Sequence, residues 1–215
     1  MRPAEPFLSA IVLAAGASVR MGRPKQLLTL RGRCLLQHAL DTVGASRLNE
    51  LVLVLGCRAD EIRAAVRLPA GLAARVVVTP DYAQGQSSSL RTGLGAADPR
   101  SVAAAILLGD QPQIAAALID RVAEAFLEAT TPIVRPVYTG VAGRVPGHPV
   151  FLAREIWPAV GCLVGDAGAR ALIATHPEWL TDVPVDGEAP ADIDTVDDYE
   201  RVVDMMRDEK IRALS

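Results

Sequence analysis

Residues 13–25, LAAGASVRMGRPK, emerge from the end of an apolar run at residues 10–14 that predicts a buried strand. The small residues at the start of this segment let the backbone come close to a ligand. Successive backbone N–H groups in such a turn form a nest for an anion. Arg20, Arg23 and Lys25 follow within six residues and can neutralise a polyphosphate. The segment therefore indicates a phosphate-binding loop after the first strand.

The rest of the chain alternates short apolar runs with longer segments of helical periodicity. Strands are predicted at residues 10–14, 51–55, 75–79, 104–108 and 133–138, each apolar enough to be buried on both faces. Helices are predicted at residues 34–46, 59–66, 87–97, 113–129, 166–175 and 196–207. This alternation predicts an α/β fold with three layers, in which a mostly parallel, Rossmann-like sheet lies between helices. Ligands bind beyond the carboxyl ends of the strands in such sheets.

Composition limits the class of protein further. The chain has 215 residues, half of them hydrophobic and 22% charged, which is typical of a globular domain. A net charge of -3 without a basic stripe argues against nucleic-acid binding, and the apolar runs are too short to cross a membrane. The N-terminal residues lack the charged start, long apolar centre and cleavage site of a signal peptide, so we expect none there. The three cysteines form no C-x-x-C pair, so we expect a reduced, cytoplasmic protein.

Two further segments follow predicted strands. In residues 81–90, DYAQGQSSSL, Gly85 permits a tight turn and the serines can cap a helix, whose N-terminus also attracts an anion or a base carbonyl. In residues 109–112, GDQP, Asp110 lies at the mouth of the sheet and can hold Mg²⁺. Simple helix capping is the alternative explanation for one of the serines and for Asp110.

The C-terminal third carries a loop and an acidic segment. The glycine-rich loop at residues 140–147 can close over a second substrate, and His148 follows it. Carbonyl capping at a strand end is the alternative role for His148. Asp192 and Asp194 point to the same face if the chain is extended there. A solvated, acidic helix start is the alternative explanation for these aspartates.

The loop resembles the L-A-[AG]-G-x-S-x-R-M-G-x-x-K signature of nucleotidyltransferases with a GT-A-like fold. Within them the chain is most similar to the MobA-like NTP transferase family, near its MocA-like branch of molybdenum cofactor (molybdopterin) cytidylyltransferases. GDQP resembles the G-D-x-P metal motif of the family, and residues 192–198 resemble its [DN]-x-[DN]-T-P-x-D segment, with Val196 in place of proline. GHPV at 147–150 and GDAGAR at 165–170 resemble the cytidylyltransferase branch. The likeness extends over residues 10–207.

This resemblance implies a role for particular residues. It places a bound nucleotide against Leu13, Ala14, Ala15, Gly16, Ser18, Arg20, Gly22, Lys25, Gln84, Gly85 and Ser88. It makes Arg20, Lys25 and Asp110 catalytic, assigns Mg²⁺ to Asp110 and Asp194, and assigns the acceptor's phosphate to Arg135, His148 and Arg170. It also implies one nucleotidyltransferase domain over residues 1–215, with a nucleotide-binding half at about 8–112 and an acceptor-binding half at about 113–207.

The implied reaction transfers CMP from CTP to a phosphorylated pterin, molybdopterin with or without molybdenum, and releases pyrophosphate. A molybdoenzyme would then receive the product. Three alternatives stay open: a GTP-using guanylyltransferase, a sugar-phosphate nucleotidyltransferase, and a non-catalytic protein that binds and delivers the pterin cofactor. A Rossmann oxidoreductase would require a G-x-G-x-x-G turn and an acid on the second strand, and the sequence has neither.

Overall fold

The computed structural model describes residues 5–141 and 143–212, without the side chains of Arg20 and of residues 206–212. The strands of the main sheet are β1 (Phe7–Ala14), β4 (Glu50–Leu55), β5 (Ala73–Val78), β6 (Ser101–Leu108), β7 (Ile133–Gly140), β8 (Gly143–Pro146), β9 (Val150–Ala153) and β10 (Leu180–Asp186). A separate small hairpin joins β2 (Thr29–Leu30) to β3 (Arg33–Cys34).

The main sheet has the order β10-β7-β9-β6-β1-β4-β5, and β8 pairs with β7. Parallel pairs join β1 to β4 and to β6, β4 to β5, and β7 to β10. In contrast, β9 is antiparallel to both of its neighbours, β6 and β7. The prediction of a mostly parallel sheet is thus confirmed, and the antiparallel strands lie in the half that follows β6.

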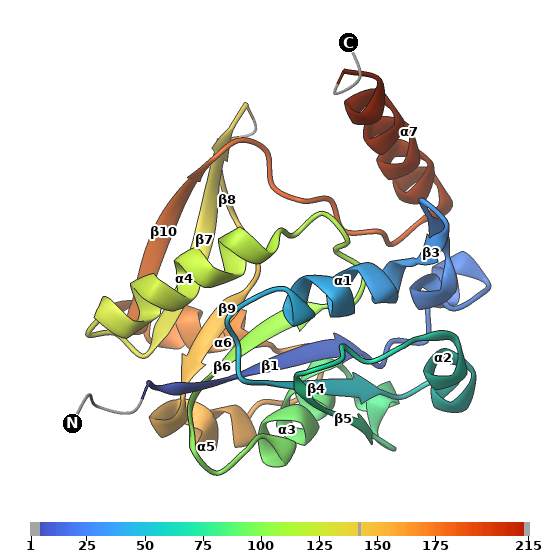
Figure 1. The fold of residues 1–215 in the computed structure, drawn as a ribbon. Helices are drawn as coiled ribbons and strands as arrows, with labels where there is room; N and C mark the ends of the chain where they lie inside the picture. Colours follow the sequence, from blue (N-terminus) through green and yellow to red (C-terminus); the bar gives the residue numbers. More distant parts are fainter. Residues whose placement is uncertain (1–4, 142, 213–215) are drawn as a thin grey trace.

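Helices cover both faces of the sheet (Figure 1). Their bounds are α1 (Leu35–Gly44), α2 (Ala59–Ala65), α3 (Gln86–Ala96), α4 (Ala116–Glu128), α5 (Trp157–Gly161), α6 (Ala169–Thr175) and α7 (Val196–Arg212). Single 3₁₀ turns occur at η1 (Val19–Met21), η2 (Lys25–Leu27), η3 (Tyr82–Gln84), η4 (Arg154–Ile156) and η5 (Pro177–Trp179). The helices α1, α2 and α4 pack into the apolar cluster on one face, and α3, α5 and α6 pack into the cluster on the other. The predicted three-layer fold is confirmed.

The strand residues form these layers because nearly all of them are aliphatic. Every residue of β4 is buried, and the fully buried leucines there and on α1 each contribute about 1.5–3 kcal/mol relative to an exposed side chain. The expectation that the segment at 75–79 is buried on both faces is wrong. It forms β5, which lies at the edge of the sheet, where side chains are only half covered and Val78 is 54% exposed.

A third, smaller apolar cluster anchors the C-terminal helix α7, which projects from the body of the molecule (Figure 1). Val202 of α7 packs there with Leu28, Leu30 and Leu35 from the segment after the first loop. The Tyr199 hydroxyl also donates to the carbonyl of Thr29. These contacts tie the start of α7 to the N-terminal half of the chain.

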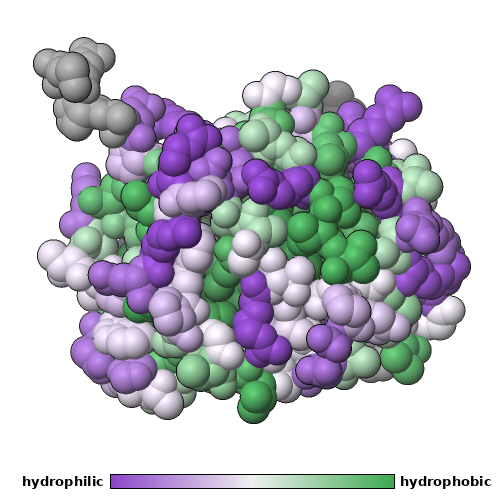
Figure 2. Space-filling view, turned by 90° about the horizontal axis from the view of Figure 1, so that it is seen from below, coloured by the Kyte–Doolittle hydropathy of each residue, from purple (hydrophilic) through white to green (hydrophobic). Residues whose placement is uncertain are grey.

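The surface over α3 and α5 is mixed in character. Seen from below, hydrophilic side chains lie among smaller hydrophobic areas (Figure 2). Among the described residues, the structure contains no helix that is both long and apolar enough to span a membrane. The large apolar side chains are instead concentrated in the two clusters on either side of the sheet.

Candidate active site

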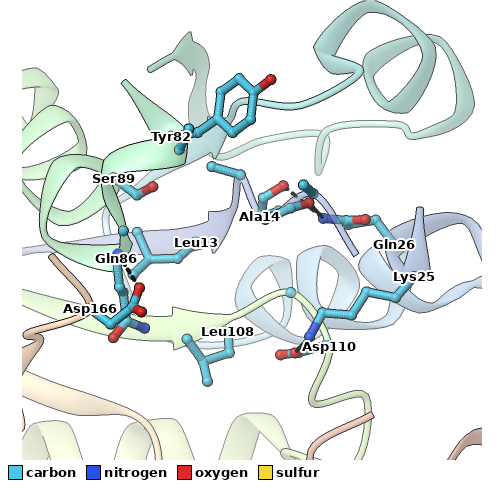
Figure 3. A pocket seen from close by; sticks show the side chains of 16 residues that line it. Leu13, Ala14, Lys25, Gln26, Tyr82, Gln86, Ser89, Leu108, Asp110 and Asp166 are labelled. Carbon is cyan, nitrogen blue, oxygen red and sulfur yellow. Dashed lines mark hydrogen bonds and ion pairs between the residues drawn. The ribbon is translucent and has the colours of Figure 1, made fainter. Parts of the chain in front are cut away.

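The loop after β1 is shaped by Gln26, a buried glutamine on η2. Its side chain is 2% exposed, and Nε2 donates to the carbonyl of Ala14 at 3.0 Å and to that of Gly16 at 3.2 Å (Figure 3). The Ser18 hydroxyl accepts a hydrogen bond from the backbone N–H of Lys25 at 3.0 Å. The Gln26 amide therefore hydrogen-bonds two carbonyls of the loop. Their partial negative charges are then less available to repel an anion bound there.

The other predicted residues of this loop have distinct positions. Gly22 ends η1 with a φ of +65°, a left-handed conformation that glycine adopts at little cost. Arg20 belongs to η1, but its side chain lies outside the described part of the structure. Its contacts therefore stay predictions. Arg23, the third cation of the loop, is exposed to solvent.

Lys25 joins the two aspartates that were predicted to hold a metal. Its Nζ contacts Asp110 Oδ2 and lies 2.7 Å from Asp194 Oδ1. The Lys25 and Asp110 side chains are 18% and 12% exposed, so this pair is largely shielded from water, whereas the Asp194 side chain is 41% exposed. Burial by itself lowers the pKa of Lys25, but attraction and hydrogen bonds from Asp110, and then from Asp194, raise that pKa above its ordinary value. Lys25 is accordingly an ammonium ion at neutral pH.

Both aspartates lie where segments that are distant in the sequence come together. Asp110 follows Gly109, whose N–H donates to the carbonyl of Leu13 at 2.9 Å. A Cβ at Gly109 would lie 2.9 Å from a methyl carbon of Leu36, so a larger residue here would require the Leu36 side chain to shift. On the other side, Asp194 directly precedes the start of α7.

A reciprocal cap fixes that start of α7. Asp198 N–H donates to the Thr195 hydroxyl at 3.2 Å, and the Asp198 carboxylate accepts from Thr195 N–H at 2.8 Å and from Asp194 N–H at 3.3 Å. A hydrogen bond from the Thr195 hydroxyl also holds the pKa of Asp198 below its ordinary value. The backbone of Asp194 is thereby held in place beside Lys25.

The N-terminus of α3 forms the opposite wall. Gly85, with a φ of +102°, packs so closely that an added Cβ would lie 2.3 Å from the carbonyl carbon of Gly165. The N–H of Gln86 donates to Asp166 Oδ1 at 3.3 Å, as Figure 3 shows. The segment at 165–166 therefore caps this helix, and it brings the C-terminal third of the chain against the N-terminal half.

These elements enclose a first cavity of about 370 Å³ at the carboxyl ends of β1 and β6. Seven of the predicted nucleotide-site or metal-site residues line it: Leu13, Ala14, Ala15, Gly16, Lys25, Gly85 and Asp110. Predicted residues Gln84 and Ser88 do not. The Gln84 amide donates to Asp81, and the buried Ser88 hydroxyl donates to the carbonyls of Asp81 and Gly85. From this segment, the side chains of Gln86 and Ser89 line the cavity instead.

A second cavity, of about 450 Å³, adjoins the first. Arg135, His148 and Arg170, which were predicted to bind one acceptor, all line it. Gln86 and Asp166 line both cavities and so form the boundary between them. Small residues of the 167–171 segment and Ile173 supply much of the remaining wall, so this cavity is lined by both apolar and cationic side chains.

Two polar side chains of the second cavity, Arg135 and His148, are held in place by the protein. Arg135 Nε donates to Asp182 Oδ1 at 2.9 Å, which fixes the guanidinium on β7. His148 Nδ1 lies 3.1 Å from the carbonyl of Ile106, so Nδ1 carries a proton and donates it. Burial lowers the pKa of His148, against opposing effects from this bond and from Asp192 and Asp110. His148 is therefore neutral near pH 7, and its Nε2 is an acceptor.

Asp192 is oriented by a residue that follows Asp110. The Gln111 amide donates to Asp192 Oδ1 at 2.6 Å. Gln111 is 7% exposed, and its Oε1 has no hydrogen-bond partner among the described residues. A buried carbonyl oxygen without a partner is expensive, so a water molecule or ligand at this position would be stabilised.

The donor set fits a hard divalent cation. Asp110 and Asp194 offer carboxylate oxygens, which Mg²⁺ prefers, and one ammonium already bridges both of them. Among the described residues, no group of three or more His, Cys, Asp or Glu side chains is arranged to hold a metal. Two carboxylates leave room for phosphate oxygens and water, as in sites where Mg²⁺ is bound together with a nucleotide.

Several lining residues were not assigned to the site from the sequence. Gln26, Tyr82, Gln86, Ser89 and Asp166 all line the first cavity. Gln86 and Asp166 belong to the motifs at residues 81–90 and 165–170, but the contact between them forms only in the folded chain. Gln26 directly follows Lys25 in the loop signature, and this position was the available sequence signal.

The fold is that of an α/β protein with a cavity at the carboxyl ends of its parallel strands, where nucleotide-binding folds bind their ligands. The chain belongs to the MobA-like NTP transferase family, because the model of that domain matches residues 10–179. The resemblance that the first loop suggested is thereby confirmed, and the chain is a member of a nucleotidyltransferase family.

Individual relatives extend over almost the whole chain. Nicotine blue oxidoreductase of Paenarthrobacter nicotinovorans is 34% identical, over 92% of this chain and 97% of its own length. The crystal structure of Rv0371c from Mycobacterium tuberculosis H37Rv superimposes with a TM-score of 0.80 at 34% identity and covers 94% of this chain and all of that one. A structure of Rv0371c in complex with manganese has a TM-score of 0.76 at 33% identity, covering 92% of this chain and 98% of that one.

Proposed function

We propose that the chain catalyses attack of a phosphate monoester on the α-phosphorus of a nucleoside triphosphate, with release of pyrophosphate. The observation that carries this proposal is the Lys25–Asp110–Asp194 cluster beside the first loop, with a second cationic cavity next to it. The triphosphate lies in the first cavity, and the acceptor lies in the second. Gln86 and Asp166, at the boundary, are then nearest to the reacting groups.

The chain's own residues supply position and charge. A phosphomonoester is already largely an anion at neutral pH, since its second pKa is near 6 in general. The reaction therefore needs alignment and charge stabilisation rather than a strong base. The first loop binds the phosphates, Lys25 and Arg20 stabilise the leaving pyrophosphate, and Arg135, His148 and Arg170 hold the acceptor.

Asp110 and Asp194 would hold a divalent cation, which supplies Lewis-acid stabilisation of the phosphates when it is bound. The donor set of two carboxylates supports Mg²⁺, and the manganese complex of Rv0371c supports the use of a divalent metal in this family. The three cysteines are free thiols, which supports a reducing, cytoplasmic setting.

For the substrates we propose CTP and molybdopterin, with or without bound molybdenum. The LAAG form of the loop and the GHP and GDAGAR segments support this pair by resemblance. The lining of the second cavity supports this pair, because its apolar side chains suit a planar ring and its arginines suit a phosphate. A molybdoenzyme would receive the product. GTP, or a sugar phosphate as acceptor, would use the same cluster.

The test is pyrophosphate release with Mg²⁺, each of the four nucleoside triphosphates, and molybdopterin prepared with and without molybdate. Asp110→Asn should lower turnover by at least about a hundredfold, because a metal ligand contributes several kcal/mol to the transition state. Asp120→Asn, at an exposed ion pair with Arg47, is the matched control and should retain turnover. Equal turnover in the Asp110 variant and the wild type would refute the metal assignment.

The similarity to nicotine blue oxidoreductase favours a second candidate, an oxidoreductase activity toward a dye such as nicotine blue, which a reduced nicotinamide dinucleotide as hydride donor would test. Gln86 and Asp166 line both cavities, so two ligands bound there would lie next to each other. Loss of absorbance of the reduced dinucleotide in the presence of such a dye would support it. This activity should survive Asp110→Asn, since hydride transfer does not need the metal cluster, whereas pyrophosphate release should not.

A further inference from the structure

Lys25 occupies a position that conflicts with its role in the proposed function. In that function Lys25 stabilises the pyrophosphate, while Asp110 and Asp194 hold a divalent cation. In the structure the Lys25 ammonium itself contacts both carboxylates. An ammonium and a metal ion cannot occupy the same place between the two carboxylates. Loading the site therefore requires Lys25 to exchange partners.

The geometry allows this exchange without a change in the fold. The backbone N–H of Lys25 is fixed by the Ser18 hydroxyl, and η2 holds the residue in a 3₁₀ turn. Beyond that fixed point, Lys25 has a flexible four-carbon side chain. It also lines the first cavity together with Ala15 and Gly16. Rotation of the side chain alone can move Nζ from the aspartates toward a phosphate in the loop.

The contacts of Lys25 with the two carboxylates are strong enough to compete with a divalent cation. All three side chains are at least partly shielded from water, with exposures of 18% for Lys25, 12% for Asp110 and 41% for Asp194. Shielding strengthens the attraction between opposite charges. A divalent cation that enters alone must displace the ammonium and leave it without these partners. A cation that enters with a triphosphate gives the ammonium a new anionic partner.

We propose that Lys25 is a resident counter-ion that opposes metal binding until nucleotide phosphates arrive. This inference rests on the proposed function, because it takes Asp110 and Asp194 as the metal ligands. Nucleotide and metal then bind with positive cooperativity, and Lys25 carries part of the coupling. The site avoids taking up a metal ion that has no substrate to act on.

The test measures Mn²⁺ binding to the full chain without nucleotide, from the loss of the electron paramagnetic resonance signal of free Mn²⁺. Lys25→Met should bind Mn²⁺ at least about tenfold more tightly than the wild type, because it removes two charge-assisted contacts and one alone corresponds to about that factor. Lys25→Gln, which keeps a hydrogen-bond donor but no charge, should shift in the same direction. Arg23→Met removes an exposed cation of the same loop and should change Mn²⁺ affinity by less than about twofold.

The Tm is a second readout, which stays informative if a variant folds poorly. Without Lys25 the carboxylates lack this counter-ion, so saturating Mn²⁺ should raise the Tm of Lys25→Met more than that of the wild type. Calorimetric titration with CTP and GTP measures the coupling between nucleotide binding and Mn²⁺ binding directly. Mn²⁺ should strengthen binding of the preferred nucleotide to the wild type by a larger factor than to Lys25→Met.

The outcomes separate this inference from the proposed function. If Asp110→Asn abolishes Mn²⁺ binding while Lys25→Met binds Mn²⁺ no more tightly than the wild type, the counter-ion role is overturned and the metal assignment stands. If Asp110→Asn leaves Mn²⁺ binding unchanged, or if neither the wild type nor Lys25→Met binds Mn²⁺ with or without nucleotide, the metal assignment fails and the counter-ion role fails with it. Tighter binding in Lys25→Met, lost again in the double variant with Asp110→Asn, supports both.

Discussion

Replacement of Gln26 by leucine should loosen the first loop without touching any charged group of the site. Gln26 is 2% exposed, and its amide donates at 3.0 Å to Ala14 and at 3.2 Å to Gly16. Leucine has a similar volume but offers no donor. The buried position is therefore refilled, while both carbonyls lose their partner.

The two carbonyls differ in what this loss costs. Ala14 is 5% exposed, so water cannot readily replace the amide at its buried carbonyl, and the lost hydrogen bond costs about 1–3 kcal/mol. Gly16 is exposed, and water can replace the amide there at little cost. The expected loss is thus about 2 kcal/mol, or a Tm lower by about 4–8 °C for a chain of this length. Nucleotide affinity should fall about tenfold, because binding must now order at least one further residue.

Urea unfolding and calorimetric nucleotide titration measure the two effects. Gln37→Leu is the matched control, since Gln37 lies on the half-buried side of α1 and also bonds a backbone carbonyl, that of Arg67. It should leave nucleotide affinity unchanged. A Gln26→Leu protein whose stability lies within about 0.5 kcal/mol of the wild type, with unchanged nucleotide affinity, would refute the reasoning.

Two further predictions concern the wall of the site. Gly85→Ala should lower the free energy of unfolding by at least about 2 kcal/mol and weaken the binding of both substrates. The added Cβ would meet the backbone of Gly165, and the φ of Gly85 is +102°. Gly95→Ala, on the same helix with no atom near its Cβ, should be neutral or stabilising in the same urea titration. Because burial lowers the pKa of His148, the folded state resists its protonation, and stability should fall as pH drops below about 6.5, the ordinary histidine value. His148→Asn can keep the bond to Ile106 but does not titrate, so its Tm should fall less between pH 7.5 and pH 5.5; equal losses would contradict the assignment.

Local patterns determined much of this protein. The aliphatic runs at residues 10–14, 51–55 and 104–108 are continuous enough to predict buried parallel strands. A parallel sheet places its ligands at the strand ends, so the position of Asp110 after β6 could be predicted without coordinates. The glycine-rich loop with its cations was likewise readable, because a phosphate nest depends on residues that are adjacent in sequence.

Other features depend on contacts between distant segments. Lys25 and Asp194 are separated by 169 positions, and no local pattern says that one ammonium bridges Asp110 and Asp194. The antiparallel insertion of β9 between β6 and β7 is also not encoded by periodicity, because an apolar strand has the same alternation in either direction. That insertion brings His148 against Ile106.

The sequence by itself therefore determined which residues can carry charge and which segments form the sheet. Tertiary structure decided that Gln86 and Ser89, rather than Gln84 and Ser88, line the first cavity, because the direction of a side chain depends on the exact start of α3. It also decided that Gln26 supports the loop, since a glutamine is buried only where two carbonyls converge on it. Burial and partnership are properties of the packed chain, and they set the energy of each polar group.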